Sequence, residues 1–335
     1  MIILSENWIN DILHETSHRY GIQADKLVKI GGGFENEMFG HNDPENKIVV
    51  RLTPPGHKTV DEVLAEMDWL KYLYENGAPV ERVVPSKNEQ VVEVISHDLG
   101  EIPVVCFEWA PGRLVKPEDF SPDLFRTWGR AIGIMHALTK DYEKPPDPIS
   151  RIQWFDDEYL SRELIPSDQE KVLERYDELM SYFRNLPMTK DSFGLIHQDV
   201  HHENLFIDGN KITVLDFDDC VYGHFILDIA NALGFAIWEK SDDVTNEAFA
   251  KVFLEHFLKG YEEENHLEEF WIEQLPKALK LFEFIHYIAF CMDHDLAGEG
   301  SFDKLDEKTK DILTRYRNSI ENDLPYIENT FCPYR

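Results

Sequence analysis

The chain has 335 residues, 43% of them hydrophobic, which is enough to bury a large core and predicts two domains or lobes. Its 33 Lys and Arg against 64 Asp and Glu give a net charge of −31, which argues against nucleic acid and anionic membranes as partners. Four scattered cysteines argue against a disulfide scaffold. No apolar run is long enough to span a membrane, and no basic N-terminal segment indicates a signal peptide, so we expect a cytoplasmic protein.

The first 109 residues predict a small lobe made of strands and one main helix. A short amphipathic helix is expected from Ser5 to Tyr20, followed by two strands on either side of the glycine run 31–33. In residues 48–53 a hydrophobic side chain stands at every second position. This period of two predicts a strand with Ile48, Val50 and Leu52 on one face.

The main helix of this lobe is predicted from Thr59 to Asn76. Thr59 and Glu62 have the spacing of a capping box, and Gly77 stands where a helix-ending glycine belongs. Glu66 lies on the same face as the apolar residues of this helix, which is unusual for a carboxylate. Two further strands are expected at 91–96 and 103–109.

The segment Trp109-Ala110-Pro111-Gly112 predicts a break in the chain, so we place the boundary there and expect domains 1–109 and 110–335. The second domain is predicted to be mainly helical. Helices are expected at 121–138, 169–185, 226–238, 246–262 and 275–291. The strand-like pieces of this part surround residues 195–219. The predicted fold class is therefore α+β, with a small sheet-containing lobe and a large helical lobe.

The most informative segment of the sequence runs from Leu195 to Asp219. His197, Asp199 and Asn204 follow the pattern H-x-D-x-x-x-x-N, and Asp216 comes twelve residues later at the end of a largely β-branched run. Phosphoryl transfer needs a carboxylate that orients a hydroxyl and accepts its proton, and oxygen ligands for Mg²⁺ on the nucleotide phosphates. Asp199 could supply the first group, and Asn204 and Asp216 the second.

Two features of the same segment leave alternatives open. Asp218 could bind metal or touch substrate, or it could be a solvated turn residue like its neighbour Asp219. His197, His201 and His202 superficially resemble a zinc cluster, but no further ligands stand at a familiar spacing. A zinc hydrolase is therefore a remote alternative, and His197 is expected to brace the loop from inside.

Two groups in the first domain could serve a nucleotide. Backbone N–H groups at Gly32 and Gly33, with Asn36, could cover phosphates, although glycine runs between strands are often plain hairpin turns. Arg51 stands mid-strand among apolar residues and Glu66 on an apolar helix face. These positions predict a shielded ion pair whose cation also reaches phosphate oxygens.

Together these residues resemble the aminoglycoside phosphotransferase and choline kinase-like family, distant relatives of the protein kinases. The resemblance rests on His197-Gln198-Asp199 with Asn204, and on Asp216-Phe217-Asp218, and covers roughly residues 25–300. It implies a two-lobed protein-kinase-like fold with Asp199 as the catalytic base. It also implies that Asn204 and Asp216 bind Mg²⁺.

The resemblance assigns further roles and shows two departures. Glu66 is expected to pair with the strand cation, the backbone of Glu108-Trp109-Ala110 to bind adenine, and Asp228 to support the catalytic loop. The strand cation is Arg51 where the family typically has Lys, which keeps the charge but changes its geometry. Gln198 replaces the common Gly, which is tolerated unless the backbone there needs a positive φ.

The function that follows is an ATP-dependent (or GTP-dependent) and Mg²⁺-dependent transfer of the γ-phosphate to a hydroxyl of a small molecule. The acidic composition favours a cationic acceptor, with Trp154–Tyr159 and Phe284–His294 as the expected acceptor wall. A protein Ser/Thr kinase of the same fold and a nucleotide-binding pseudokinase scaffold are the alternatives. Monomer and homodimer are both compatible with the sequence.

Overall fold

The computed structural model describes residues 6–32, 36–41, 43, 47–98, 100–298 and 300–327. Contacts divide the chain into two compact units, each of which is drawn from several segments. Unit 1 comprises Met1–Leu114, Asp141–Arg151 and Leu205–Asp218, and unit 2 comprises Val115–Lys140, Ile152–Asn204 and Asp219–Arg335. The segment that carries Asp216 therefore packs with the N-terminal part of the chain, whereas Asp199 belongs to unit 2.

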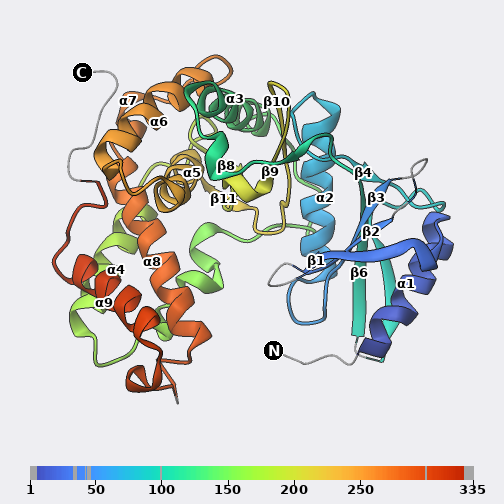
Figure 1. Cartoon of the computed structure of the whole chain (residues 1–335), viewed down its shortest axis with the longest axis horizontal. Helices are drawn as coiled ribbons and strands as arrows, with labels where there is room; N and C mark the ends of the chain where they lie inside the picture. The colour runs from blue at the N-terminus through green and yellow to red at the C-terminus, as the bar shows by residue number, and fades with distance from the viewer. Residues whose placement is uncertain are drawn as a thin grey trace. The chain divides into compact units, whose positions relative to one another are not determined.

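Unit 1 is built around a six-stranded antiparallel sheet (Figure 1). Its strands are β1 (Leu27–Gly32), β2 (Glu37–His41), β3 (Ile48–Leu52), β4 (Val83–Val84), β5 (Glu93–His97) and β6 (Gly100–Glu108). The order is β1-β2-β3-β6-β4, and β5 also pairs with β6. Two helices belong to this unit, α1 (Glu6–Tyr20) and α2 (Val60–Glu75). Ser5, the predicted start of α1, lies outside the described residues.

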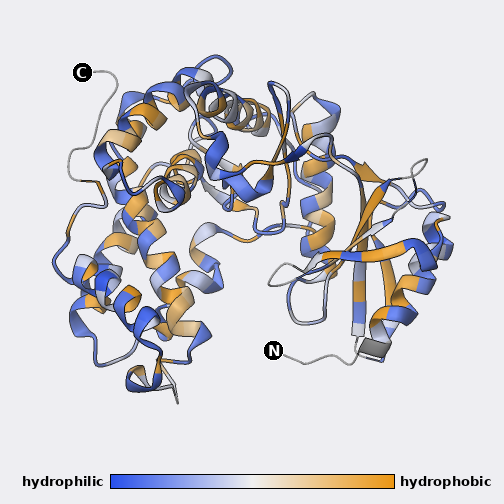
Figure 2. Ribbon diagram, in the orientation of Figure 1, coloured by the Kyte–Doolittle hydropathy of each residue, from blue (hydrophilic) through white to orange (hydrophobic). Residues whose placement is uncertain are grey.

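The two faces of strand β3 have different roles, as its alternating sequence predicts. Ile48, Val50 and Leu52 join a hydrophobic cluster that includes Trp8 and Ile12 of α1. Figure 2 shows the concentration of hydrophobic residues on the strands of this sheet. Because side chains alternate along a strand, Arg51 lies on the opposite face, on which it meets α2.

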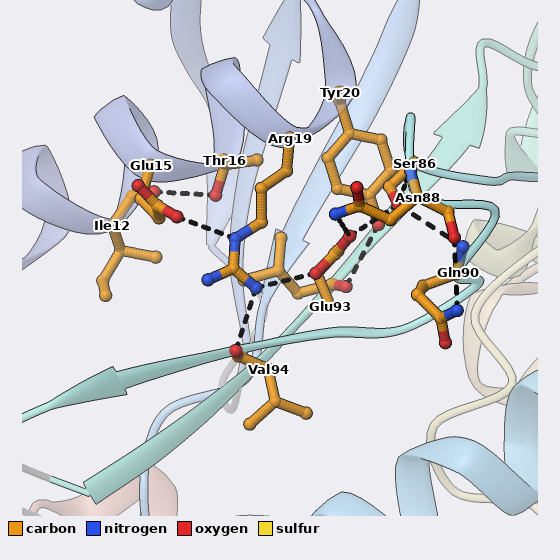
Figure 3. Close-up of polar contacts among 11 residues, drawn as sticks. Ile12, Glu15, Thr16, Arg19, Tyr20, Ser86, Asn88, Gln90, Glu93 and Val94 are labelled. Atoms are coloured by element: carbon orange, nitrogen blue, oxygen red, sulfur yellow. Dashed lines mark hydrogen bonds and ion pairs between the residues drawn. The ribbon is translucent and has the colours of Figure 1, made fainter.

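A polar network holds α1 against the sheet (Figure 3). Arg19 donates to the Glu93 carboxylate at 2.7 Å and to the Val94 carbonyl at 3.0 Å. The same carboxylate accepts hydrogen bonds from Ser86 at 2.5 Å and Asn88 at 3.1 Å. The Glu93 side chain is buried, yet these donors keep its pKa below the usual value although burial alone would raise it.

The predicted limits of α2 are confirmed. The Glu62 amide donates to the Thr59 hydroxyl at 3.2 Å and the Thr59 amide donates to the Glu62 carboxylate at 2.9 Å, which completes the capping box. Beyond the last turn Gly77 has a φ of +89°, a conformation that favours glycine. The helix therefore holds Glu66 at a fixed height over the sheet.

A second, three-stranded sheet of unit 1 joins distant parts of the chain. It contains β7 (Arg113–Leu114), β9 (Leu205–Asp208) and β10 (Lys211–Val214), in the order β10-β9-β7. Gly112 is essential for this pairing, since a Cβ atom there would stand 2.0 Å from the Ile207 carbonyl oxygen. The strand β7 was not predicted because two residues are too few to show an alternating pattern.

Unit 2 is mainly helical and contains one small antiparallel pair of strands, β8 (Phe193–Ile196) and β11 (Val221–His224). Its helices are α3 (Pro122–Thr139), α4 (Glu170–Arg184), α5 (Phe225–Glu239), α6 (Asn246–Tyr261), α7 (Glu269–Ile272), α8 (Leu275–Asp293) and α9 (Glu307–Glu321). Five of these match the predicted helices to within one or two residues at each end. The helix α9 was not predicted, and of its residues only Leu313 and Ile320 are buried.

Short 3-10 helices complete both units, at Ala24–Lys26, Pro117–Asp119, Trp154–Asp156, Glu158–Leu160, Arg162–Leu164, His202–Asn204 and Phe302–Lys304. The combination of antiparallel sheets and helices confirms the predicted α+β class. Within the described part of the chain, no helix has the length and apolar character needed to cross a membrane.

Helices α3 and α6 pack unusually closely through glycines on both partners. A Cβ atom on Gly129 would stand 1.9 Å from the Phe257 carbonyl oxygen, and one on Gly260 would stand 1.9 Å from that of Arg126. Such distances leave no room for side chains between the two backbones. The close approach brings His136 of α3 next to Tyr261 of α6 in the interior of unit 2.

Candidate active site

The predicted ion pair between strand β3 and helix α2 is confirmed. The Arg51 guanidinium donates to both Glu66 carboxylate oxygens, at 2.7 and 2.6 Å, which is a bidentate arrangement. Only 2% of Arg51 and 0% of Glu66 is exposed. Burial opposes the charge on Arg51, but the neighbouring Glu66 and then Asp218 outweigh it and raise the pKa of the guanidinium. Position 51 therefore carries a permanent, shielded positive charge.

Asp218 is the centre of a second polar cluster in unit 1. Its Oδ2 atom contacts His57 Nε2 at 2.5 Å and accepts a hydrogen bond from Asn36 Nδ2 at 2.9 Å. Its Oδ1 atom lies 3.8 Å from Arg51 Nη1. Burial would raise the pKa of this carboxyl, but the His57 contact and the Arg51 charge together lower it. With 4% of its surface exposed, Asp218 is not the solvated turn residue of one sequence-based alternative.

Three buried polar atoms of this cluster have no hydrogen-bond partner among the described residues. They are Asn36 Oδ1, Asp218 Oδ1 and Arg51 Nε. Buried polar groups are almost always paired, and leaving one unpaired costs about 1–3 kcal/mol. Two oxygens suit a hard divalent cation, and a guanidinium N–H group suits a phosphate oxygen. The cluster therefore has the chemistry of a metal–phosphate site.

Asp216 has a backbone conformation that only a few non-glycine residues adopt. Its φ is +61°, in the left-handed region. Its amide donates to Glu81 Oε1 at 2.7 Å. Burial, together with the charge of Asp216, raises the pKa of Glu81 to about 8, and the hydrogen bond from the Asp216 amide only partly offsets this. Sequence reasoning missed Glu81, since it stands in a connection with no motif around it.

In unit 2 the loop after β8 holds Asp199 and Asn204 together. Asn204 Nδ2 donates to the Asp199 carbonyl at 2.9 Å and to Asp199 Oδ2 at 3.0 Å. His201 Nε2 lies 3.2 Å from the same Oδ2 atom. Among the described residues, the Asp199 carboxylate is therefore contacted only at Oδ2, and the side-chain amide of Asn204 makes its contacts only through Nδ2. One oxygen of each side chain remains for other ligands.

The buried carboxylate of Asp228 organises the same loop. It accepts hydrogen bonds from the amides of His197 at 3.0 Å and Gln198 at 2.8 Å, and it contacts His136 Nε2 at 3.0 Å. Burial would raise its pKa, but His136 and then His197 keep the pKa below the usual value. His136 in turn contacts the Tyr261 hydroxyl at 2.9 Å. Helices α3, α5 and α6 are therefore connected to the loop by buried hydrogen bonds.

Gln198 adopts the conformation for which a glycine would be expected. Its φ is +71°, so the backbone does need the left-handed region at this position. A side chain there costs about 1–2 kcal/mol. The hydrogen bond from the Gln198 amide to Asp228 holds this conformation.

An aromatic row begins at the Asp199 loop and ends at the surface of unit 2. The His201 ring lies 4.6 Å from that of Phe235, which lies 5.1 Å from Trp238 and 5.2 Å from His286. Trp238 is 41% exposed. Burial lowers the pKa of His286 to about 4, so this ring is neutral near pH 7. Of these residues, only His286 falls within the acceptor wall predicted at Phe284–His294.

The other predicted acceptor segment is partly corrected by the structure. Trp154 is fully buried and packs against Phe183 and His224, so it belongs to the core rather than to an exposed wall. Phe155 stacks instead with Arg184 at the surface, with 5.2 Å between the guanidinium carbon and the ring centre.

The predicted adenine-binding segment lies at the end of β6. The Glu108 amide donates to the Arg82 carbonyl at 2.8 Å, and the Trp109 amide donates to that of Lys47 at 3.3 Å. The Trp109 ring, 39% exposed, lies against Gly40, where a Cβ atom would stand 2.7 Å from the ring. Ala110 follows directly. Gly32 ends β1 and pairs with Glu37, and Gly33 lies outside the described residues.

The predicted site residues thus fall into two groups. Unit 1 contains Gly32, Asn36, Arg51, Glu66, Glu108, Trp109, Ala110, Asp216 and Asp218, and unit 2 contains Asp199 and Asn204. The three histidines of the zinc alternative lie in different surroundings, although the rings of His201 and His202 are 5.9 Å apart. His197 is buried, His201 lies against Phe235, and His202 lies against Phe120. Over the described residues, no three His, Cys, Asp or Glu side chains form a group able to hold a metal ion.

Comparison with known proteins identifies relatives for nearly the whole chain. The family described as "Phosphotransferase enzyme family" matches residues 26–270. Amicoumacin kinase of Bacillus subtilis (strain 168) is 34% identical over 317 residues, which is 94% of this chain and 92% of that protein. A solved amicoumacin kinase, in complex with AMP-PNP, Ca²⁺ and Ami, superposes with a TM-score of 0.88 at 32% identity and covers 97% of this chain and 95% of its own.

A more distant neighbour shows the same fold. A microcompartment-associated aminopropanol kinase has a TM-score of 0.71 and 22% identity, with 93% of this chain and 95% of that chain covered. These similarities confirm the predicted protein-kinase-like α+β fold. They also agree with the resemblance read from the Asp199 and Asp216 motifs.

Proposed function

Because the chain belongs to the phosphotransferase enzyme family, and is a small-molecule phosphotransferase, we propose that it transfers the γ-phosphate of ATP to a hydroxyl of a small molecule in a Mg²⁺-dependent reaction. The observation that supports this best is the Asp199 loop, in which Asn204 and His201 fix one carboxylate oxygen. The other oxygen can then face an acceptor hydroxyl. A positioned carboxylate of this kind contributes typically 10²–10⁴-fold to proton transfer.

Each group of residues has a distinct task in this proposal. Asp199 orients the acceptor hydroxyl and takes its proton while the acceptor oxygen bonds to the γ-phosphorus and ADP leaves. Asn204 and Asp216 would each supply an oxygen ligand to Mg²⁺, and Asp218 adds negative charge next to Asp216. Bound Mg²⁺ neutralises charge on the phosphates. Arg51 attracts phosphate oxygens while Glu66 fixes its orientation.

Nucleotide binding is assigned mainly to residues 1–109. Asn36 and the backbone N–H groups of Gly32 and Gly33 cover the phosphates, and the backbone of Glu108–Ala110 binds adenine. The Glu108 and Trp109 amides already donate within the protein, so the adenine contacts come from carbonyl oxygens and from the Ala110 amide. Residues 110–335 provide the catalytic base and the acceptor wall, apart from the Asp216 segment, which packs with unit 1.

Amicoumacin is the first acceptor to test, since the relative named for it is 34% identical along nearly the whole chain. The wild-type protein is incubated with ATP, Mg²⁺ and amicoumacin, and phosphorylated product is followed by mass spectrometry. We expect a product that carries one phosphoryl group and forms only with both ATP and Mg²⁺. A cationic amino alcohol and a test protein serve as alternative acceptors in parallel.

The possible outcomes separate the candidate functions. Label on the protein substrate alone indicates a protein kinase. Nucleotide that raises the melting temperature without any transfer indicates a pseudokinase. No thermal shift with ATP and Mg²⁺ together contradicts nucleotide binding itself.

The aromatic row beside Asp199 provides a separate prediction about the acceptor. Trp238→Ala is expected to raise the acceptor KM roughly fivefold, because an exposed indole contributes about 1 kcal/mol to binding a cation or ring on its face. The KM for ATP should stay unchanged. The matched control is Phe270→Ala, which removes a similarly exposed ring from helix α7. Equal acceptor KM values for the two variants would show that Trp238 does not contact the acceptor.

A further inference from the structure

Glu81 has no assigned role, yet it contacts the backbone of a residue proposed to bind metal. We infer that Glu81 is a positioning residue: its carboxyl oxygen accepts the Asp216 amide and holds that residue in the left-handed conformation that presents its side chain to the metal. This inference rests on the proposed role of Asp216. It adds to that role a residue from a different part of unit 1, the connection between α2 and β4.

The conformation of Asp216 needs an external restraint. A left-handed non-glycine residue costs of the order of 1–2 kcal/mol, and it persists only when its surroundings fix it. The surroundings fix the chain on both sides of this residue. Val214 exchanges backbone hydrogen bonds with the 79–81 segment, and Phe217 is buried against Trp69 with 5.4 Å between ring centres. The Glu81 carboxyl binds the amide between them.

The backbone pairing makes Glu81 well placed for this task. The Glu81 amide donates to the Val214 carbonyl at 3.0 Å, and the Val214 amide donates to the Pro79 carbonyl at 2.8 Å. Val80 and Val214 form a parallel bridge. These contacts are independent of the Glu81 side chain. Removal of the carboxyl is therefore expected to release the Asp216 amide and leave the pairing of the two segments intact.

Glu81 does not form an ion pair within the described part of the chain. Among the described residues, no cationic side chain lies within 4.0 Å of its carboxyl, and its neighbour Arg82 pairs with Glu108. A carboxylic acid accepts a hydrogen bond through its carbonyl oxygen just as a carboxylate does. The contact with the Asp216 amide therefore needs an oxygen at this position but no charge.

This distinction defines the test, which compares Glu81→Ala with Glu81→Gln. Gln keeps a carbonyl oxygen in the same place, whereas Ala removes it. Supporting groups behind a metal ligand are worth roughly 10–100-fold in metal affinity, so we expect Glu81→Ala to raise the Mg²⁺ concentration for half-maximal activity by about tenfold or more. The acceptor KM should not change. Glu81→Gln should stay within about twofold of the wild type.

A second measurement does not depend on activity. Hydrogen–deuterium exchange of a peptide that spans residues 214–218 should be faster in Glu81→Ala, because one protected amide loses its acceptor. The control is Glu101→Ala, which makes the same substitution at an exposed position on β6. It should leave both the Mg²⁺ dependence and the exchange unchanged.

The results separate this inference from the proposed function. A wild-type protein without Mg²⁺-dependent transfer contradicts the proposed function, and the exchange measurement still tests the hydrogen bond. The inference is wrong if Glu81→Ala matches the wild type in Mg²⁺ dependence. It is equally wrong if Ala and Gln variants are impaired to the same degree, or if the acceptor KM rises with that for Mg²⁺.

Discussion

Asp199→Asn is expected to lower turnover by about 10²–10⁴-fold, the usual contribution of a positioned general base. Asn retains the shape of the side chain and an oxygen that can accept from Asn204, but it cannot take the proton of the acceptor hydroxyl. ATP binding and the melting temperature should stay close to those of the wild type, because Asp199 contacts only its own loop among the described residues. Single-turnover phosphate transfer measures the loss.

The matched control for this variant is Asp191→Asn. Asp191 lies just before β8 with 76% of its side chain exposed, so the same chemical change there should leave turnover unaltered. Wild-type turnover in Asp199→Asn would show that another group accepts the proton. A large loss of ATP binding in the same variant would instead indicate that Asp199 supports the nucleotide.

Asp228→Ala is expected to destabilise the protein by about 3–5 kcal/mol, the typical cost of breaking a buried charged contact. Its carboxylate is fully buried and is shared by the amides of His197 and Gln198 and by His136. In the variant, the amides of His197 and Gln198 and the His136 ring stay buried but have lost this acceptor. Urea unfolding at pH 7 gives the free energy directly.

The same contact predicts a pH dependence with a definite sign. The pKa of Asp228 in the folded protein is lower than in the unfolded chain, where it is about 3.9. Its stabilisation is therefore fully present above that value and is lost as the pH falls through the lower, folded-state pKa. The stability gap between wild type and Asp228→Ala should be constant from pH 5 to 8 and narrow below about pH 4.

Two further variants keep this prediction testable. Glu239→Ala removes an exposed carboxylate from the same helix, and its effect should stay within about 0.5 kcal/mol. If Asp228→Ala fails to fold, Asp228→Asn keeps the volume and one acceptor oxygen and should show an intermediate loss. Equal stability of Asp228→Ala and Glu239→Ala would mean that the buried network contributes nothing net.

The local parts of the fold could be predicted from the sequence because their signals are local. The capping box at Thr59 and Glu62 and the period of the helical segments fixed element limits to within a few residues. The Arg51–Glu66 pair was also predictable, since a cation within an apolar strand and a carboxylate on an apolar helix face can each be buried only with a partner.

What the sequence did not reveal depends on contacts between distant segments. Glu81 touches Asp216 across 135 positions, and nothing in the residues around it indicates that contact. The aromatic row combines residues from α5 and α8, whose rings meet only in the folded unit. The polar helix α9 was not predicted from the sequence because only two of its side chains are buried.

Gln198 is a departure from the family pattern whose consequence only the structure could show. From the sequence, the replacement of Gly was expected to be tolerated unless the backbone needs a positive φ at this position. The structure has a φ of +71° there, held by Asp228. The chain therefore tolerates a residue with a strained backbone in this loop because a buried carboxylate holds the two successive amides of His197 and Gln198.

The guanidinium at position 51 also determines which chemical reagents can report on this protein. Nucleotide analogues that acylate an amine need a lysine able to lose its proton, whereas arginine stays protonated throughout the accessible pH range. Arg51 is further protected from reagents because it is 2% exposed and donates two hydrogen bonds to the Glu66 carboxylate. Activity-based profiling with lysine-directed ATP probes would therefore leave this position unlabelled, however active the enzyme is in the sample.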